Sequence, residues 1–210
     1  MSRLGELYAL DGTDPTKLRA IYDEWATTYN KELADSSQDY VAPALAAAYL
    51  LQALQTPRIN DTLEILDAGC GTGLVGSHLA ALGAKKIDGI DLSTGMLRVA
   101  ENTGAYRSLD TVDLSEALHF KDGTYDAVTC VGTLTLGHVG PAVLGEFARV
   151  VKTGGFIVAT ILESIFSEGG YEETIRGLVA SGKVQVVGAQ LEDYRRGQGV
   201  KAWMIVLRAV

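Results

Sequence analysis

The sequence is poor in the features that mark extracellular and metal-stabilised chains. Its 210 residues include only two cysteines, Cys70 and Cys130, and neither has a second cysteine close to it. This spacing predicts neither a disulfide framework nor a zinc site, and we expect no bound metal. The first residues lack the basic start and apolar core of a secretory signal, so we expect a cytoplasmic protein.

The sequence also lacks long basic and long apolar runs. Acidic residues outnumber basic ones by 26 to 18, and the densest basic stretch is the pair Arg195 and Arg196. Because a nucleic-acid-binding surface needs many clustered cations, we expect no nucleic-acid partner. The apolar stretch Val41 to Leu54 falls short of the ~20 residues that a membrane span requires, so we expect no membrane insertion. Hydrophobic residues at 47% and charged residues at 21% are typical of a folded domain.

The first 60 residues are predicted to form a helical cap. Apolar residues recur at three- and four-residue steps from Thr16 to Glu32, after Asp14 as a cap and Pro15 in the first turn. An alanine- and leucine-rich stretch predicts a second helix over Pro43–Gln55. We expect residues 61–210 to form one compact unit with this cap.

From residue 61 onward, short β-branched runs alternate with helical stretches, which is typical of a parallel sheet covered by helices. The final two runs are joined by a loop too short for a crossover helix, so they should pair antiparallel. We therefore predict an α/β, Rossmann-like sheet of seven mostly parallel strands with an antiparallel C-terminal hairpin and an N-terminal helical lid. The predicted strands are Thr62–Ala68, Lys86–Ile90, Arg107–Thr111, Tyr125–Val131, Gly155–Ile161, Lys183–Gln190 and Lys201–Arg208. The predicted helices are Gly73–Leu82, Ser93–Asn102, Pro141–Val151 and Glu168–Ser181.

A glycine-rich loop joins the first predicted strand to its helix. It reads Asp67-Ala68-Gly69-Cys70-Gly71-Thr72-Gly73. Glycines allow a sharp turn and a close approach to a ligand, and the free N–H groups at a helix start favour a negative or polar group. A carboxylate such as that of a methionine moiety would fit there.

The same loop has a competing interpretation, because Gly71-Thr72-Gly73-Leu74-Val75-Gly76 is a literal dinucleotide fingerprint. In that fingerprint the first glycine normally follows the strand directly. Here Asp67 ends the strand and three alternating glycines follow it, which favours S-adenosylmethionine over NAD or FAD. A purely structural turn is the third interpretation.

Two further aspartates end strands at the same predicted edge. Asp91 follows the second strand and could accept hydrogen bonds from both hydroxyls of a ribose. It could instead cap a helix, although Ser93 already supplies that function. Asp113 follows the third strand and could accept the adenine amino group, or it could be a solvated loop residue.

Four segments together resemble successive motifs of class I S-adenosylmethionine-dependent methyltransferases. They are Leu66–Gly73, Gly89–Ser93, Tyr125–Val128 and Val150–Gly155, and the resemblance spans roughly Tyr22 to Val210. Two more segments, Ile21–Asn30 and Gly137-His138-Val139, are similar to the methyltransferase-like proteins named for the Williams-Beuren syndrome region.

The resemblance implies a role for each position of the cofactor site. Gly69 and Gly71 would line the methionine part, beside Asp67 and Cys70 of the same loop, and Val131 would pass under it. The resemblance places Asp91 at the ribose, and Leu92, Met96, Asp113 and Leu114 around the adenine. It also makes Tyr22, Trp25 and Tyr29 a lid over the cofactor, although such an aromatic stripe is equally typical of core packing.

Methyl transfer requires alignment and exclusion of water but no covalent catalyst. If the acceptor is a hydroxyl or a protonated amine, a base would help, and His138 after the fourth strand is the candidate. It could instead cap its loop or pack against the lid helix. We expect O-, N- or C-methylation of a small molecule by a monomer or weak homodimer. An S-adenosylmethionine-binding protein without transfer (a cyclase or partner subunit) and an NAD(P)-dependent oxidoreductase are the alternatives.

Overall fold

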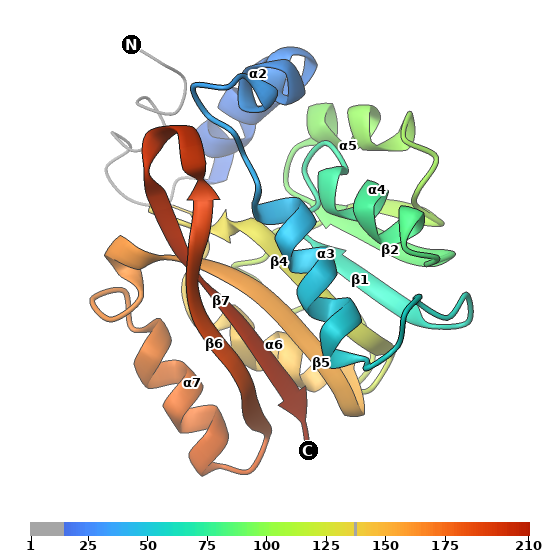
Figure 1. Ribbon diagram of the computed structural model, residues 1–210, viewed down its shortest axis with the longest axis vertical. Coiled ribbons are helices and arrows are strands. Elements are labelled where there is room, and N and C mark those ends of the chain that lie inside the picture. The colour runs from blue at the N-terminus through green and yellow to red at the C-terminus, as the bar shows by residue number, and fades with distance from the viewer. Residues whose placement is uncertain (1–14, 137) are drawn as a thin grey trace.

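A computed structural model of the chain describes residues 15–136 and 138–210. The predicted cap residue Asp14 and the motif residue Gly137 lie outside this range. The described part forms one seven-stranded sheet with helices on both faces, and Figure 1 shows helix α3 in front of the strands and helix α6 behind them.

The sheet has the strand order β3-β2-β1-β4-β5-β7-β6. Strands β1 to β5 pair parallel to one another, whereas β7 lies antiparallel to both β5 and β6. This confirms the predicted Rossmann-like sheet with its antiparallel C-terminal hairpin. The strands are β1 Glu64–Ala68, β2 Lys86–Asp91, β3 Ser108–Thr111, β4 Tyr125–Leu134, β5 Val151–Leu162, β6 Val184–Arg195 and β7 Val200–Ala209.

The helices follow the predicted order with small changes at their ends. They are α2 Pro15–Ala34, α3 Ala42–Ala53, α4 Leu74–Ala81, α5 Thr94–Glu101, α6 Val143–Val150 and α7 Tyr171–Ala180. Short 3₁₀ turns follow β5 and β6 at 163–165 and 196–198. Figure 1 shows α2, in blue, beyond the carboxyl ends of the parallel strands.

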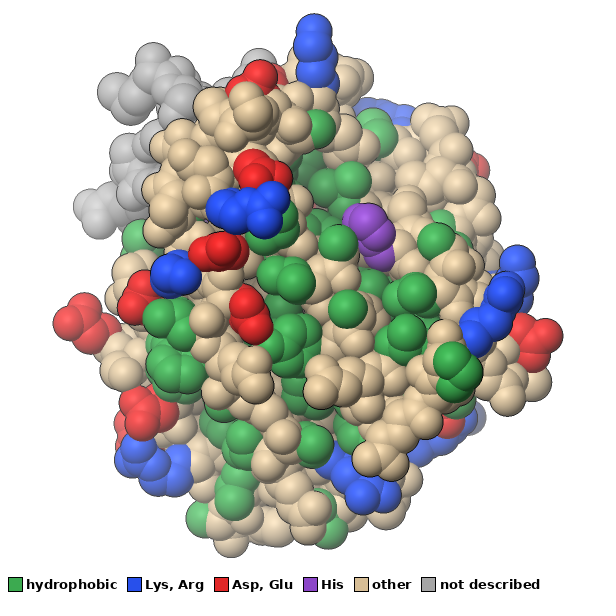
Figure 2. Space-filling view, in the orientation of Figure 1, with side chains coloured by type: hydrophobic (Ala, Val, Ile, Leu, Met, Phe, Trp, Pro, Cys, Tyr) green, Lys and Arg blue, Asp and Glu red, His purple; other side chains and the backbone are tan. Residues whose placement is uncertain are grey.

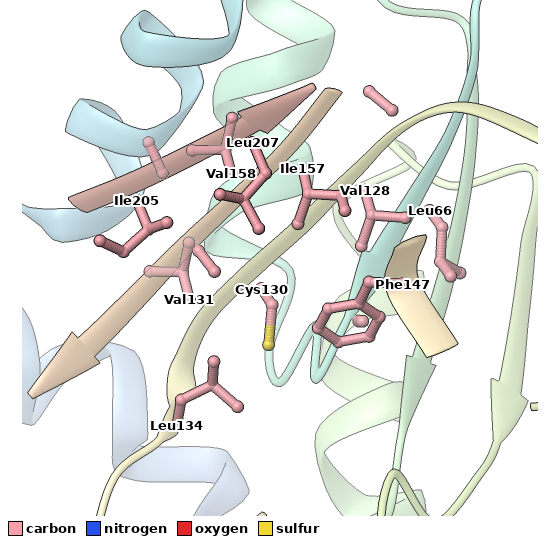
Figure 3. Packing of buried hydrophobic residues seen from close by; sticks show 14 of the residues in the cluster. Leu66, Val128, Cys130, Val131, Leu134, Phe147, Ile157, Val158, Ile205 and Leu207 are labelled. Carbon is pink, nitrogen blue, oxygen red and sulfur yellow. The ribbon is translucent and has the colours of Figure 1, made fainter. Parts of the chain in front are cut away.

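The core lies between the central strands and the helices that cover them. Leu66, Val128, Ile157 and Leu207 occupy matched register positions on β1, β4, β5 and β7, and all four are fully buried. Figure 3 shows these side chains in a row across the sheet. Because buried apolar area is the main favourable term in folding, this row fixes the strands whose carboxyl ends carry the site.

The N-terminal helical segment divides into two parts that pack differently. In α3, Ala46 and Leu50 are fully buried and belong to the main core of the sheet. In α2, Leu18 and Trp25 form a separate small apolar cluster with Leu92 packed against it. Helix α3 is therefore part of the sheet domain, and α2 alone lies over the strand ends.

Strand β6 is longer than its sequence predicted, since it continues from Gln190 to Arg195. The extra residues include Glu192 and Asp193, which are unfavourable in isolated strands. Here they pair with the start of β7, and Lys201 lies 3.0 Å from the Asp193 carboxylate. Tertiary pairing overrides local propensity and carries Arg195 toward the strand ends.

The described helices include none that is both long enough and apolar enough to cross a membrane. On the face drawn in Figure 2, blue Lys and Arg side chains lie mostly beside red Asp and Glu side chains, not in one broad patch.

Candidate active site

A cavity of about 950 Å³, open to solvent, lies under α2 at the carboxyl ends of β1, β2 and β4. This is the edge at which open α/β sheets bind their ligands. The cavity brings together twelve of the residues that the sequence predicted for the site. They are Tyr22, Tyr29, Gly69, Cys70, Gly71, Asp91, Leu92, Met96, Asp113, Leu114, Val131 and His138.

The glycine loop forms the floor of this cavity in a backbone conformation that favours glycine. Gly69, Gly71 and Gly73 have φ values of +71°, +53° and +87°. A Cβ added to Gly69 would lie 2.0 Å from the Thr133 hydroxyl oxygen, so no side chain fits at that position. A Cβ on Gly71 would have no heavy atom within 4 Å, because the space beside Gly71 is open.

Asp91 ends β2 and holds the glycine loop with its carboxylate. Its two oxygens accept hydrogen bonds from the backbone N–H of Gly71 at 2.8 Å and of Ser93 at 2.9 Å. Ser93 itself caps α5 by accepting from the Met96 N–H, so capping is not the role of Asp91. Burial raises the pKa of Asp91. Since a carboxylate oxygen can accept more than one hydrogen bond, Asp91 retains capacity toward a ligand hydroxyl.

The other end of the cavity is an apolar slot with one polar edge. Met96 and Leu114 are buried there, beside the half-buried Leu92. Asp113 accepts hydrogen bonds from the N–H of Ser115 at 2.8 Å and from its hydroxyl at 2.6 Å. The turn thereby fixes the position of the Asp113 carboxylate at the edge of the slot.

Helix α2 closes over the cavity, and two of its anchor points lie at Asp23 and Asn30. Asp23 accepts hydrogen bonds of 2.6 Å from the Ser93 hydroxyl and from the Gly95 N–H. Burial acts to raise the pKa of Asp23, but these hydrogen bonds outweigh it and lower the pKa. At the second point, Thr72 of the glycine loop donates to the Asn30 side chain. The sequence had not singled out these contacts of α2.

Two predicted site residues lie behind the wall of the cavity. Trp25 is 1% exposed and donates its indole N–H to Glu32 at 2.8 Å. Asp67 is also 1% exposed and accepts hydrogen bonds from Tyr106 at 2.7 Å and Thr129 at 2.8 Å. Burial raises the pKa of Asp67 to about 6 despite these donors. Trp25 therefore packs in the small apolar cluster of α2. Asp67 fixes the start of the glycine loop through its hydrogen bonds to Tyr106 and Thr129.

His138 is held in a defined orientation beside the lid helix. Its Nδ1 lies 2.7 Å from the Leu136 carbonyl oxygen, which can only accept, so Nδ1 carries the proton. Its Nε2 lies 2.8 Å from the Tyr22 hydroxyl and is therefore the acceptor of that hydrogen bond. Burial lowers the pKa of His138, which favours the neutral ring. The hydrogen bond to Tyr22 shows that His138 contacts the lid helix, which was one of the alternatives to a role as a base. The same arrangement places the unprotonated Nε2 at the wall of the cavity.

A smaller pocket of about 350 Å³ adjoins this end of the cavity. Its lining includes Tyr40, Tyr194 and Arg195, which the sequence analysis had not assigned to the site. Tyr40 forms a β-bridge with Arg195, although the two lie far apart in the chain. No local pattern signals such a contact, so only the folded chain shows it. Within the described residues there is no group of three or more His, Cys, Asp and Glu side chains placed to hold a metal ion.

The comparisons with known proteins agree with this geometry. Residues 65–155 match the methyltransferase domain family. The chain is 41% identical over 185 residues to human methyltransferase-like protein 27, a match that covers 88% of the chain and 69% of that protein. It is 43% identical over 105 residues to a ubiquinone biosynthesis O-methyltransferase of Paraburkholderia xenovorans, covering 47% of the chain and 44% of that protein.

The fold is also shared with a solved structure of the [4+2]-cyclase SpnF. The TM-score is 0.69 over 96% of the chain and 98% of the cyclase, at 14% sequence identity. This likeness concerns the fold, whereas the likeness to the human protein concerns sequence over most of the chain. The chain therefore belongs to the class I S-adenosylmethionine-dependent methyltransferases, in the branch that includes methyltransferase-like protein 27.

Proposed function

We propose that this methyltransferase acts on a small-molecule acceptor and uses His138 as a general base. The observation that carries the proposal is the neutral Nε2 of His138 at the wall of the cavity, where the Tyr22 hydroxyl lies 2.8 Å away. An acceptor hydroxyl or amine that replaced the Tyr22 hydroxyl at this nitrogen could pass its proton to it.

The cavity residues have the chemistry that S-adenosylmethionine requires. In the proposal, Asp91 accepts from the ribose hydroxyls, Asp113 from the adenine amino group, and Leu92, Met96 and Leu114 pack on the adenine ring. The glycine loop takes the methionine moiety, for which the open space beside Gly71 leaves room. When bound, the cofactor would supply an activated methyl group on a positively charged sulfur.

The protein's own part in the reaction is to position the acceptor and exclude water. Helix α2 covers the reacting end of the cavity through Tyr22 and Tyr29, and Asp23 holds the helix in place. Because no covalent bond between the protein and a substrate is needed, this placement supplies most of what catalysis requires. The lid also narrows the access of an acceptor to the cavity, which supports a small acceptor over a macromolecule.

The matched ubiquinone biosynthesis enzyme, which is named as an O-methyltransferase, supports oxygen as one target atom. We also propose that the protein acts in the cytoplasm as a monomer or weak homodimer.

The test is a transfer assay with methyl-labelled S-adenosylmethionine. The purified protein is incubated with separate panels of phenols, amines and carbon acids, and with transfer RNA and unfolded protein as macromolecular acceptors. We expect the label in a small molecule, with S-adenosylhomocysteine formed in equal amount. Label only in a macromolecule would contradict the proposal. Cofactor binding with no transfer to any acceptor would favour a non-transferring role, as in a cyclase or a partner subunit.

A further inference from the structure

Strand β6 is the outer strand at one side of the sheet, next to β7 (Figure 1). Within the part of the chain that the structure describes, its only pairing besides β7 is the bridge of Arg195 to Tyr40 at its end. Residues 185–187 and 189–191 are exposed. The outer edge of β6 therefore leaves backbone N–H and C=O groups available to a further strand.

The exposed part of β6 has no charged side chain. Residues 184–191 include no Lys, Arg, Asp, Glu or Pro. Folded proteins usually protect an outer strand with such residues, or keep the strand short. The outer strand at the other side of the sheet, β3, follows this rule, because it has four residues and carries the exposed Asp110. Strand β6 thus lacks the usual adaptations of an edge that faces solvent.

Exposed apolar side chains gather around the same edge. Among the described residues, six large apolar side chains are exposed, and five of them lie at the end of α7, on β6 or at the last position. These five are Val179, Val186, Val187, Leu191 and Val210. The N–H of Val210 donates to the Lys183 carbonyl at 3.1 Å, which places Val210 beside the start of β6. A gathering of this kind is typical of a surface that contacts another protein.

An irregularity in β6 increases this exposure. The register to β7 shifts between Val186 and Gly188, and Val187 has no partner on β7. Val187 is 54% exposed. A bulge can protect an edge from pairing, but this one exposes a second valine and not a charged residue.

Charged side chains of opposite sign flank the uncharged stretch. Lys183 precedes it, and Glu192 and Asp193 follow it. Both Lys183 and Asp193 are five positions from Gly188. If two copies of β6 paired antiparallel about Gly188, Lys183 of each copy would therefore lie opposite Asp193 of the other, which is a favourable cross-strand pair. Lys201 of the same chain contacts one oxygen of the Asp193 carboxylate, and a carboxylate can accept from a second cation.

We propose that the outer edge of β6 is the contact surface of a homodimer, in which two copies pair antiparallel about Gly188 and join their sheets. The same surface serves both copies, which is the two-fold arrangement of most homodimers. One pair of strands with a few apolar side chains makes a small interface, so the dimer is weak. The inference goes beyond the proposed function and does not depend on it, because residues 183–193 line neither the cavity nor the smaller pocket.

The first test is sedimentation equilibrium at protein concentrations from about 1 µM to about 1 mM. We expect the unmodified protein to pass from monomer to dimer over this range. Val187→Lys places a charge near the middle of the edge and should raise the dissociation constant of the dimer at least about tenfold. The matched control Thr111→Lys places the same charge at an exposed position of β3 and should leave the dissociation constant unchanged.

A second test exchanges the flanking charges. Lys183→Glu and Asp193→Lys should each weaken the dimer, because like charges then lie opposite each other. An equal mixture of these two variants should dimerise again, because each copy then supplies the charge that the other requires. Pairing with a different protein, or contact through another surface, does not produce this recovery.

The outcomes that would overturn the inference are distinct from failure of the proposed function. They are a monomer at every concentration, equal effects of Val187→Lys and Thr111→Lys, and no recovery in the mixture. The melting temperature of each variant is measured beside its oligomeric state, and the charge exchange still decides if Val187→Lys does not fold. Failure of the unmodified protein to bind S-adenosylmethionine would instead overturn the proposed function and leave the dimer inference standing.

Discussion

The imidazole of His138 illustrates how single residues set the chemistry. The Leu136 carbonyl fixes the proton on Nδ1, and burial lowers the pKa of the ring from its usual value of 6.5. Because the ring stays neutral at pH 7, Nε2 is available as a base. The acidic limb of a pH–rate profile should therefore fall below pH 6.5.

His138→Asn tests this role with little structural change, because the Asn amide can still donate to the Leu136 carbonyl. We expect kcat at pH 7 to fall by about 10²- to 10⁴-fold, the usual contribution of a general base. The dissociation constant of S-adenosylmethionine should be unchanged. Tyr22→Phe is the control, since it removes the hydroxyl that occupies Nε2 and should leave most of the activity. Full activity of His138→Asn would exclude the histidine as a base.

Among the individual site residues, the sequence predicted the positions of those that belong to local motifs. Gly69, Gly71 and Asp91 lie where the pattern of glycines and strand ends placed them. Trp25 and Asp67 lie behind the wall, because helical periodicity and loop position do not show which side chain faces a cavity. Nothing in the local sequence shows that Arg195 is buried, since its burial depends on pairing with Tyr40 from another part of the chain.

At the scale of elements, helix α2 is the part of the site that depends on a few polar anchors. Its own apolar cluster is small and separate from the main core. Asp23 supplies two short hydrogen bonds to the start of α5, and their loss would leave the helix held by that cluster and by the hydrogen bonds of Asn30 with Thr72 and of Tyr22 with His138. The lid is therefore expected to open more readily than the sheet.

Asp23→Ala should loosen the lid without unfolding the domain. We expect the affinity for S-adenosylmethionine to fall about fivefold, in line with the ~1 kcal/mol contribution of such hydrogen bonds, and cleavage within α2 by a protease to accelerate. Isothermal titration and limited proteolysis measure the two effects. The exposed residue Thr27 on the same helix gives the control Thr27→Ala, which should change neither. An unchanged proteolysis rate in Asp23→Ala would show that the other contacts of α2 hold the helix in place without Asp23.

The existence and order of the elements followed from the sequence, but their ends did not. Alternating apolar runs and helical stretches predicted all seven strands and the antiparallel hairpin. The extension of β6 through Glu192 and Asp193 could not be predicted, because pairing with β7 sets it rather than local propensity. Likewise α3 was assigned to the cap, since an alanine-rich helix does not show which surface will bury it.

At the scale of the whole molecule, the fold explains why one cavity collects residues from across the chain. The central strands end at one edge, so the loops after β1, β2 and β4 meet there, and α2 closes over them. The antiparallel pair β6 and β7 extends the sheet beside this edge and brings Arg195 to the end away from Asp91. The main cavity and the smaller pocket are thus adjacent by topology.

The most direct test of this account is isothermal titration of the purified protein with S-adenosylmethionine and, separately, with NADH. We predict binding of S-adenosylmethionine alone, weakened at least about tenfold by Asp91→Ala and unchanged by Asp110→Ala, a matched control at an exposed position of β3. Binding of NADH without binding of S-adenosylmethionine, or full affinity in Asp91→Ala, would contradict the account.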